Sequence, residues 1–271
     1  MTKQITICVF GDIVGKIGRK ALTKQLPIIK NKFKPDLTIA NVENLAHGRG
    51  ITEKSLLEIS DAGIEAFTSG HHVWENKMGA PLLNSPKWSA RLIRPMNVDP
   101  KLPGKGWVKL SIKNQNIYLL NLQGQLYMPQ NGSSPFLTFD RFWQEQQPNP
   151  DKDILIIDLH AETTSEKMAF ANYVDGKATL VFGTHTHVPT ADPKILPGGT
   201  ANITDVGMVG SYDSVIGFEK NSSIKRFLNI TAAPYKLQEK GLTEINGLII
   251  TVNLDSHKVT VLKQIREIVD I

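Results

Sequence analysis

Residues 5–12 read ITICVFGD, a short apolar run closed by a glycine and an aspartate. Its β-branched and aromatic residues predict a buried strand over 5–10, bounded by Gly11. Similar runs recur and predict strands over 37–42, 64–68, 107–112, 117–122, 154–159 and 178–182. Near the C-terminus, 247–254 and 258–265 are expected to pair as a hairpin around 255–257.

The stretches between the first strands have helical spacing. Apolar residues within 17–33 recur at intervals of three and four, and Pro27 is expected to bend or divide this helix. Thr52 fits the N-cap of a second helix, and a third is expected after Trp74, a residue expected in the core. Strand–helix alternation followed by antiparallel pairs predicts an α/β fold, with one mixed sheet or two sheets packed face to face and helices outside.

We expect the chain to form a single domain over 1–271. Its 271 residues show no internal repeat, low-complexity tract or linker that would mark a boundary. The stretch 95–106 contains proline and glycine and predicts a long loop within the domain.

Composition excludes several classes of protein. With 41% hydrophobic and 21% charged residues, the chain is not disordered, collagen-like or a disulfide scaffold. Its net charge of +5 is dispersed, so it attracts phosphate-bearing ligands without favouring nucleic acid. The single cysteine, Cys8, fits a reducing compartment, and no apolar run reaches the ~18 residues that span a bilayer. We therefore expect a soluble, cytoplasmic protein with no membrane partner.

Polar residues of the kind that bind metals follow five predicted strands. They are Asp12, then Glu43 and Asn44, then His71 and His72, then His160, and finally His185 and His187. Ligands of open α/β sheets gather at the carboxyl ends of strands, so these side chains are expected to meet at one rim.

Each of these residues alone has an ordinary explanation, since an aspartate after a strand is often a turn former or helix cap. His185-Thr186-His187 is more suggestive, because on a strand the two rings would share a face. Imidazole and carboxylate together suit Zn, Fe, Mn or Co, and no cysteine accompanies them. The groups are too many for one ion, so the set favours two metals bridged by a carboxylate.

Four blocks of this sequence resemble the metal-binding motifs of calcineurin-like metallophosphoesterases. They are residues 10–15 (FGDIVG), 42–44 (VEN), 70–74 (GHHVW) and 183–188 (GTHTHV), and 158–167 and 203–208 also match. The Glu-Asn pair in the second block is similar to the bacterial YmdB-like branch, a family of cyclic-nucleotide phosphodiesterases. The resemblance implies a four-layer α-β-β-α sandwich of two mixed sheets, with two metal ions at the rim, Fe being favoured over Mn, Zn or Co.

The resemblance also implies residue roles. Asp12, Glu43, Asn44 and His187 would hold the first metal, and the bridging Glu43, His71, His160 and His185 the second. His72 would be the proton donor. This chain has Gly70-His71-His72 where the family usually has Gly-Asn-His, so an imidazole replaces a carboxamide ligand.

The resulting prediction is a phosphodiesterase acting on 2′,3′- and/or 3′,5′-cyclic nucleotides. A hydroxide bridging the metals would attack phosphorus, and His72 would protonate the leaving alkoxide. Loop positions suggest further substrate contacts from His47, Arg94, Asn97, Tyr212 and Ser214. A nuclease or phosphomonoesterase on the same scaffold, a regulatory protein that keeps the metal site, and a homo-oligomer are the alternatives left open.

Overall fold

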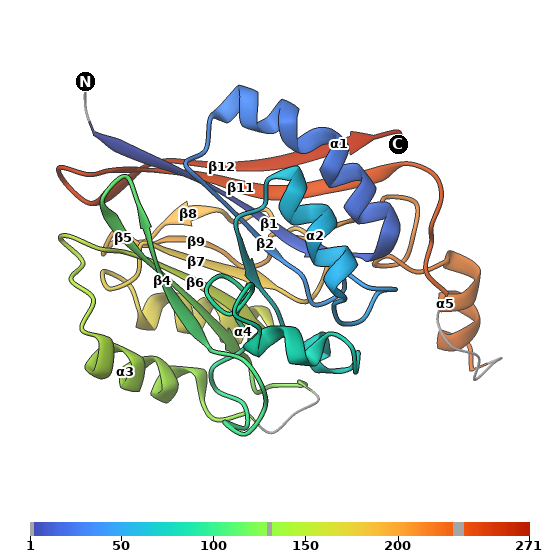
Figure 1. Cartoon of the computed structure of the whole chain (residues 1–271), viewed down its shortest axis with the longest axis horizontal. Helices are drawn as coiled ribbons and strands as arrows, with labels where there is room; N and C mark the ends of the chain where they lie inside the picture. Colours follow the sequence, from blue (N-terminus) through green and yellow to red (C-terminus); the bar gives the residue numbers. More distant parts are fainter. Residues whose placement is uncertain (1–2, 129–131, 230–235) are drawn as a thin grey trace.

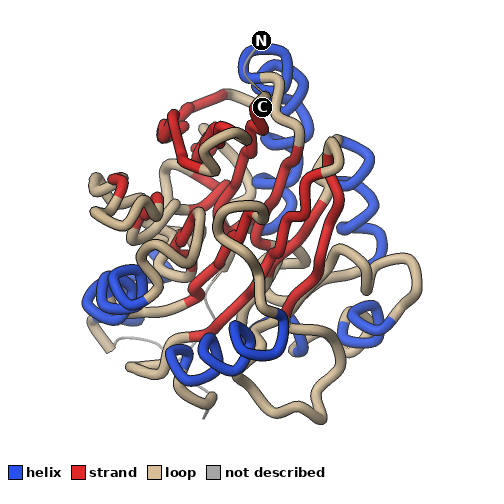
Figure 2. Tube along the Cα trace, turned by 90° about the vertical axis from the view of Figure 1, so that its left-hand side faces the viewer, coloured by secondary structure: helices blue, strands red, loops and turns tan. Residues whose placement is uncertain are grey.

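The structure is a computed structural model that describes residues 3–128, 132–229 and 236–271. It has two six-stranded sheets facing each other, with helices on the outer face of each (Figure 1). The tube in Figure 2 shows the strands between flanking helices. This arrangement confirms the predicted four-layer α-β-β-α sandwich of two mixed sheets.

The first sheet has the strand order β12-β11-β10-β1-β2-β3. Strands β2 and β10 run parallel to β1, whereas β11 runs antiparallel to it and forms the predicted hairpin with β12. The strands are β1 (Gln4–Ile13), β2 (Leu37–Asn41), β3 (Ala66–Thr68), β10 (Met208–Ser211), β11 (Thr243–Asn253) and β12 (Lys258–Val269).

The second sheet has the order β4-β5-β6-β7-β9-β8. Its middle strands, from β5 to β9, are parallel, and β4 and β8 close the two edges as antiparallel strands. The strands are β4 (Trp107–Ile112), β5 (Gln115–Gln123), β6 (Ile154–His160), β7 (Leu180–Thr184), β8 (Lys194–Ile195) and β9 (Ala201–Ile203).

Helices cover both outer faces. In Figure 1, α1 (Gly15–Phe33) and α2 (Glu53–Ala62) lie on the side of the first sheet, and α3 (Pro135–Gln146) and α4 (Thr164–Tyr173) lie on the side of the second. The short helix α5 (Lys220–Phe227) lies apart from both sheets. None of the helices in the described segments is long and apolar enough to span a membrane.

Alternation along the strands divides the core into layers. On β6, Ile154 and Ile156 belong to the cluster between the sheets, whereas Leu155 and Ile157 pack under the helices of the second sheet. The period of two along a strand produces this division, because successive side chains point to opposite faces. Both sheets contribute to the middle cluster, so neither sheet buries its inner face without the other.

Most local predictions hold, and three need correction. Thr52 caps α2 as predicted, accepting a hydrogen bond from the backbone N–H of Ser55 at 3.2 Å. The helix α1 continues undivided through Pro27, and β1 continues through Gly11 to Ile13 with a bulge before Asp12.

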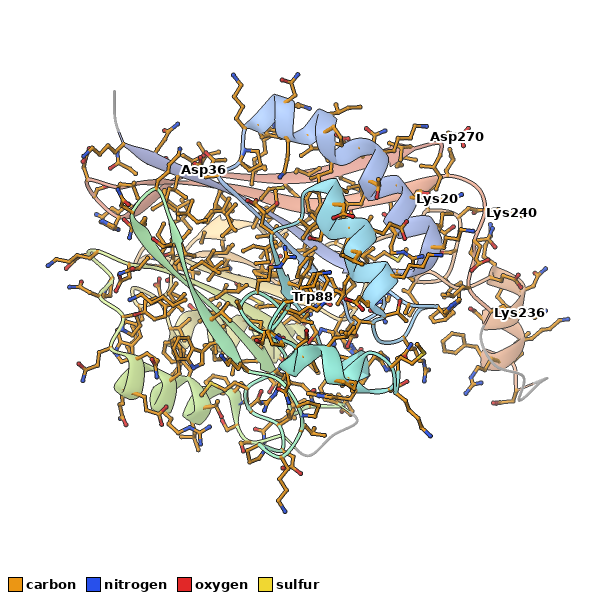
Figure 3. The ribbon with its side chains drawn as sticks, viewed as in Figure 1. Lys20, Asp36, Trp88, Lys236, Lys240 and Asp270 are labelled. Atoms are coloured by element: carbon orange, nitrogen blue, oxygen red, sulfur yellow. The ribbon has the colours of Figure 1, made fainter. Side chains whose placement is uncertain are left out.

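The third correction concerns the helix expected after Trp74. A 3₁₀ turn, η1 (His71–Trp74), ends there, and only a second short one, η2 (Ala80–Asn84), follows. Gly79 and Pro81 give that stretch poor helix propensity. The region enters the core instead through Trp88, labelled in Figure 3, which is fully buried and packs edge to face on Phe67.

Candidate metal centre

A polar layer replaces the apolar core at the carboxyl ends of the central strands. The inner face of β6 runs from Ile154 and Ile156 to Asp158 and His160, all fully buried. Neighbouring strands end in the same way, with Asn41, Thr68, Asn121 and Thr184 buried at equivalent positions. The ligand-type residues predicted from the sequence lie directly beyond this layer.

Four side chains form a compact cluster at this rim. Glu43, His71, His160 and His185 each place one potential ligand atom within 4.8 Å of all the others. The Oε1 of Glu43 lies 3.0 Å from His160 Nε2, and its Oε2 lies 3.6 Å from His71 Nδ1. Glu43 and His71 follow strands of the first sheet, whereas His160 and His185 come from the second, so the cluster joins the two sheets.

Some atoms of this rim are buried without hydrogen-bond partners. They are His71 Nδ1 and Asp12 Oδ1, while His160 Nε2 faces only the carboxylate of Glu43. A buried polar atom without a partner costs about 1–3 kcal/mol of folding free energy. A bound cation would remove this cost by accepting the lone pairs of these atoms. Gly70 leaves room for one, because a Cβ there would lie 2.2 Å from Glu43 Oε2 and 2.3 Å from His160 Nε2. The donor set of imidazoles and a carboxylate fits a transition-metal ion.

A second group of acceptors lies beside the cluster. His187 Nδ1 lies 2.9 Å from the carbonyl oxygen of Ile216, which can only accept, so Nδ1 carries a proton and the neutral ring has its lone pair on Nε2. That Nε2 lies 3.3 Å from Asn44 Oδ1, while the amide of Asn44 donates to the carbonyl of Gly48. Two acceptors facing each other fit a shared cation better than a hydrogen bond. The buried Asp12 accepts from the backbone N–H of His185 at 3.1 Å and so lies at the junction of the two groups.

The His-x-His segment is a loop beyond β7 and not a strand, so the expected shared face is wrong. His185 and His187 have φ of 98° and 65°, in the left-handed region that residues other than glycine rarely adopt. Asp205 holds this loop by accepting from the backbone N–H of Thr186 at 3.2 Å. The same carboxylate pairs at 2.6 Å with the buried Lys167, whose ammonium also donates to the carbonyl of Thr184.

Burial sets the charge of the histidines. It lowers the pKa of His71 to about 4 and that of His185 to about 2, so both are neutral at pH 7 and keep a lone pair. Burial also disfavours charge on His160, but the nearby Glu43 carboxylate outweighs it and raises the pKa of His160 to about 9. Burial opposes charge on Glu43 too, yet the facing His160 holds the pKa of this carboxyl well below its usual range. A cation entering the cluster would therefore displace a proton from His160.

His72 lies at the solvent side of the cluster. Its ring centroid is 3.8 Å from that of His71, so the two rings lie against each other. Its Nδ1 lies 2.5 Å from Glu75 Oε1, and Arg49 lies 3.4 Å from the other oxygen of Glu75. Glu75 was not among the residues predicted from the sequence. The spacing of three residues between His72 and Glu75 could have identified it, because residues i and i+3 lie on one side of a 3₁₀ turn.

The residues suggested as substrate contacts lie outside the cluster. Arg94 and Asn97 are buried, and both donate to backbone carbonyls, at 2.6 Å to Pro95 and 2.7 Å to Gln123 respectively. Ser214 donates to the carbonyl of Ser211 within a turn. His47 and Tyr212 are exposed. The described geometry thus gives Arg94, Asn97 and Ser214 a loop-holding role.

Two further residues near the cluster were missed. Glu162 places Oε2 2.9 Å from His185 Nε2, and Thr184 places its hydroxyl 2.9 Å from His160 Nδ1. Both lie within two residues of a predicted ligand in the chain, which is the signal that could have found them.

Comparisons with known proteins find similar sequences and structures. Residues 8–265 match the family model described as YmdB-like protein. The chain is 39% identical over 259 residues to a 2′,3′-cyclic-nucleotide 2′-phosphodiesterase of Bacillus subtilis (strain 168), covering 96% of each chain.

Two solved structures are also similar. A crystal structure described as a novel phosphatase of Mycoplasma pneumoniae is 35% identical with a TM-score of 0.92, covering 100% of this chain and 95% of that one. A hypothetical protein from Thermus thermophilus is 33% identical with a TM-score of 0.87, covering 97% of this chain and 99% of that one.

Proposed function

Because the chain belongs to the YmdB-like family of metallophosphoesterases, we propose that it is a metal-dependent phosphodiesterase that hydrolyses 2′,3′-cyclic nucleotides. The similarity to a Bacillus subtilis enzyme named for this activity supports the substrate, and 3′,5′-cyclic nucleotides are a second candidate. The observation that carries the proposal is the compact cluster at the strand ends, where Glu43, His71, His160 and His185 place potential ligand atoms within 4.8 Å of one another.

The proposed centre holds two metal ions that share Glu43. Asp12, Asn44 and His187 complete the first site, and His71, His160 and His185 complete the second. The mixture of nitrogen and oxygen donors suits Fe, with Mn, Zn and Co as alternatives. Such ions, when bound, act as Lewis acids on phosphoryl oxygens and lower the pKa of water.

The carboxylates of Asp12 and Glu43 set the charge of the centre. They offset two of the four positive charges of two divalent ions, which leaves a site that attracts a singly charged diester. The neutral His71 and His185 add ligands without adding charge.

His72 is proposed as the proton donor to the leaving alkoxide. Its Nδ1 faces Glu75, which can accept a hydrogen bond from it and so orient the ring. The other ring nitrogen, Nε2, is then the one that delivers a proton to the substrate. Arg49, on the far side of Glu75, restrains that carboxylate.

The test combines metal content with turnover. We expect two metal ions per chain by elemental analysis of active protein, and hydrolysis of 2′,3′-cyclic nucleotides that stops on chelation and returns with metal. Activity with one ion or none would reject the two-metal centre. Turnover of monoesters alone would indicate a phosphomonoesterase, and bound metal without any hydrolysis would indicate a regulatory protein.

A variant isolates the role of His72. Since it is not proposed as a ligand, His72→Ala should keep both ions and lose about 10²–10⁴-fold in turnover of cyclic nucleotides. The loss should be much smaller on an aryl diester with a nitrophenolate leaving group, which needs little protonation. Equal losses on both substrates, or loss of metal, would contradict the proton-donor role.

A further inference from the structure

Asp158 is a buried carboxylate for which the proposed reaction has no use. It is fully buried on β6 and accepts hydrogen bonds from three side chains. The hydroxyl of Thr68 donates at 2.5 Å, the amide of Asn41 at 3.0 Å and the hydroxyl of Thr184 at 2.7 Å. No lysine or arginine pairs with it among the described residues.

The donors come from both sheets. Asn41 and Thr68 end β2 and β3 of the first sheet, whereas Thr184 ends β7 and lies beside Asp158 in the second. Asp158 therefore ties the sheets together directly below the metal cluster. Asn41 extends this tie, because its Oδ1 accepts from the backbone N–H of Glu43 at 3.1 Å.

The hydroxyl of Thr184 connects Asp158 to a proposed metal ligand. Its oxygen lies 2.7 Å from Asp158 Oδ1 and 2.9 Å from His160 Nδ1. A hydroxyl has one proton, and Thr184 donates it to Asp158. When Thr184 donates to Asp158, it can only accept from His160, so the proton of His160 must be on Nδ1.

The other ring nitrogen is then free for a metal. A neutral His160 with its proton on Nδ1 has its lone pair on Nε2, the buried atom that lies 3.0 Å from Glu43 Oε1 inside the metal cluster. Hydrogen bonding at one ring nitrogen is the usual way in which proteins select the tautomer and orientation of a metal-binding histidine.

We propose that Asp158 is a positioning residue that acts through Thr184 to hold His160 with its proton on Nδ1 and its Nε2 directed at the metal. The inference rests on the metal centre of the proposed function. It goes further by assigning roles to two residues that touch neither metal nor substrate.

The tautomer can be measured on the wild-type protein. With Zn²⁺, which is diamagnetic, ¹⁵N-histidine NMR distinguishes the two ring nitrogens of His160, whose Nδ1 lies 2.9 Å from the hydroxyl of Thr184. We expect a protonated Nδ1 with slow exchange and a metal-bound Nε2. A protonated Nε2, or a metal on Nδ1, would overturn the proposal without any variant.

Variants test the connection through Thr184. Thr184→Val removes the hydroxyl and should weaken Zn²⁺ binding by about 10–100-fold, the usual effect of losing such a partner. Thr184→Ser keeps the hydroxyl and should stay within about threefold of wild type. Zn²⁺ affinity would be measured by competition with a chromophoric chelator.

Thr68→Val is the matched control. It removes another hydroxyl that donates to the same carboxylate, but among the described residues the hydroxyl bonded to His160 Nδ1 is that of Thr184, so Thr68→Val should lower thermal stability and leave Zn²⁺ affinity within about threefold. Equal losses in Thr68→Val and Thr184→Val, or unchanged affinity in Thr184→Val, would overturn the proposal. These measurements need no turnover, so failure to hydrolyse cyclic nucleotides would reject the proposed function and leave this inference standing.

Discussion

Replacing Gly70 by alanine should remove the second metal while leaving the chain folded. Gly70 has φ −148° and ψ −155°, an extended conformation that alanine also adopts, so the backbone needs no change. The difficulty is space. The new Cβ would lie 2.2 Å from Glu43 Oε2 and 2.3 Å from His160 Nε2, where 3.4 Å is an ordinary contact.

Both ligand atoms must therefore retreat by about 1 Å. Metal–ligand distances tolerate only about ±0.2 Å, so the two atoms cannot keep their positions around one ion. Changes to the partners of ligands already cost about 10–100-fold in affinity, and displacing two ligands should cost at least about 100-fold. At 1.36 kcal/mol for each factor of ten, this is about 2.7 kcal/mol of binding free energy.

Titration of metal-free protein with Zn²⁺ or Mn²⁺ in a calorimeter measures this effect. Gly106→Ala is the control, since its Cβ would lie 2.3 Å from Met96 Cβ and near no member of the metal cluster. Gly106→Ala should melt at a lower temperature than the wild-type protein but bind metal with the same affinity. Wild-type affinity and stoichiometry in Gly70→Ala would refute the reasoning.

Three further predictions follow from the same features. Glu43→Gln removes the negative charge between the two proposed cations, so elemental analysis should find fewer than two ions per chain. The melting temperature of the metal-free protein should change little. Two ions per chain in the variant would argue against a bridging role for Glu43. The Glu43 carboxylate raises the pKa of His160 to about 9, so below that pH a proton competes with the metal for this histidine. The apparent metal affinity should therefore fall about tenfold for each pH unit from 9 to 7. Calorimetry should detect about one proton released for each metal bound. Affinity that does not change over this range would contradict it. Since Ile39 of one sheet and Ile156 of the other belong to one core cluster, we propose a single domain over 1–271, which predicts coincident near-UV and far-UV melting curves; two separate transitions would count against it.

Much of the architecture could be predicted from local pattern. The apolar run at 5–10 and its counterparts identify the central strands, because a strand buried on both faces needs apolar side chains on both. The capping residue Thr52 identifies the start of α2 for an equally local reason, the hydrogen bond to the Ser55 backbone. These features depend on neighbours within a few positions of the chain.

The details of the site depend on residues far apart in the chain. The left-handed backbone of His185 requires Asp12, 173 positions away, to hold its N–H. The orientation of His71 and His72 follows from a 3₁₀ turn that the sequence analysis treated as a strand end. The sequence therefore predicts which residues lie at the rim, whereas the relative orientation of their side chains depends on the tertiary structure.

The division of the cluster between two sheets has a consequence for how the chain folds. Glu43 and His71 belong to the first sheet and His160 and His185 to the second, so no partly folded species with separate sheets can present the complete ligand set. Metal binding should then come after the rate-limiting docking of the sheets. In kinetic experiments, added metal should slow unfolding markedly and leave the refolding rate almost unchanged, the behaviour of a contact absent from the transition state. The ion would bind after the chain has folded and would stabilise the protein kinetically, by lengthening the lifetime of the native state.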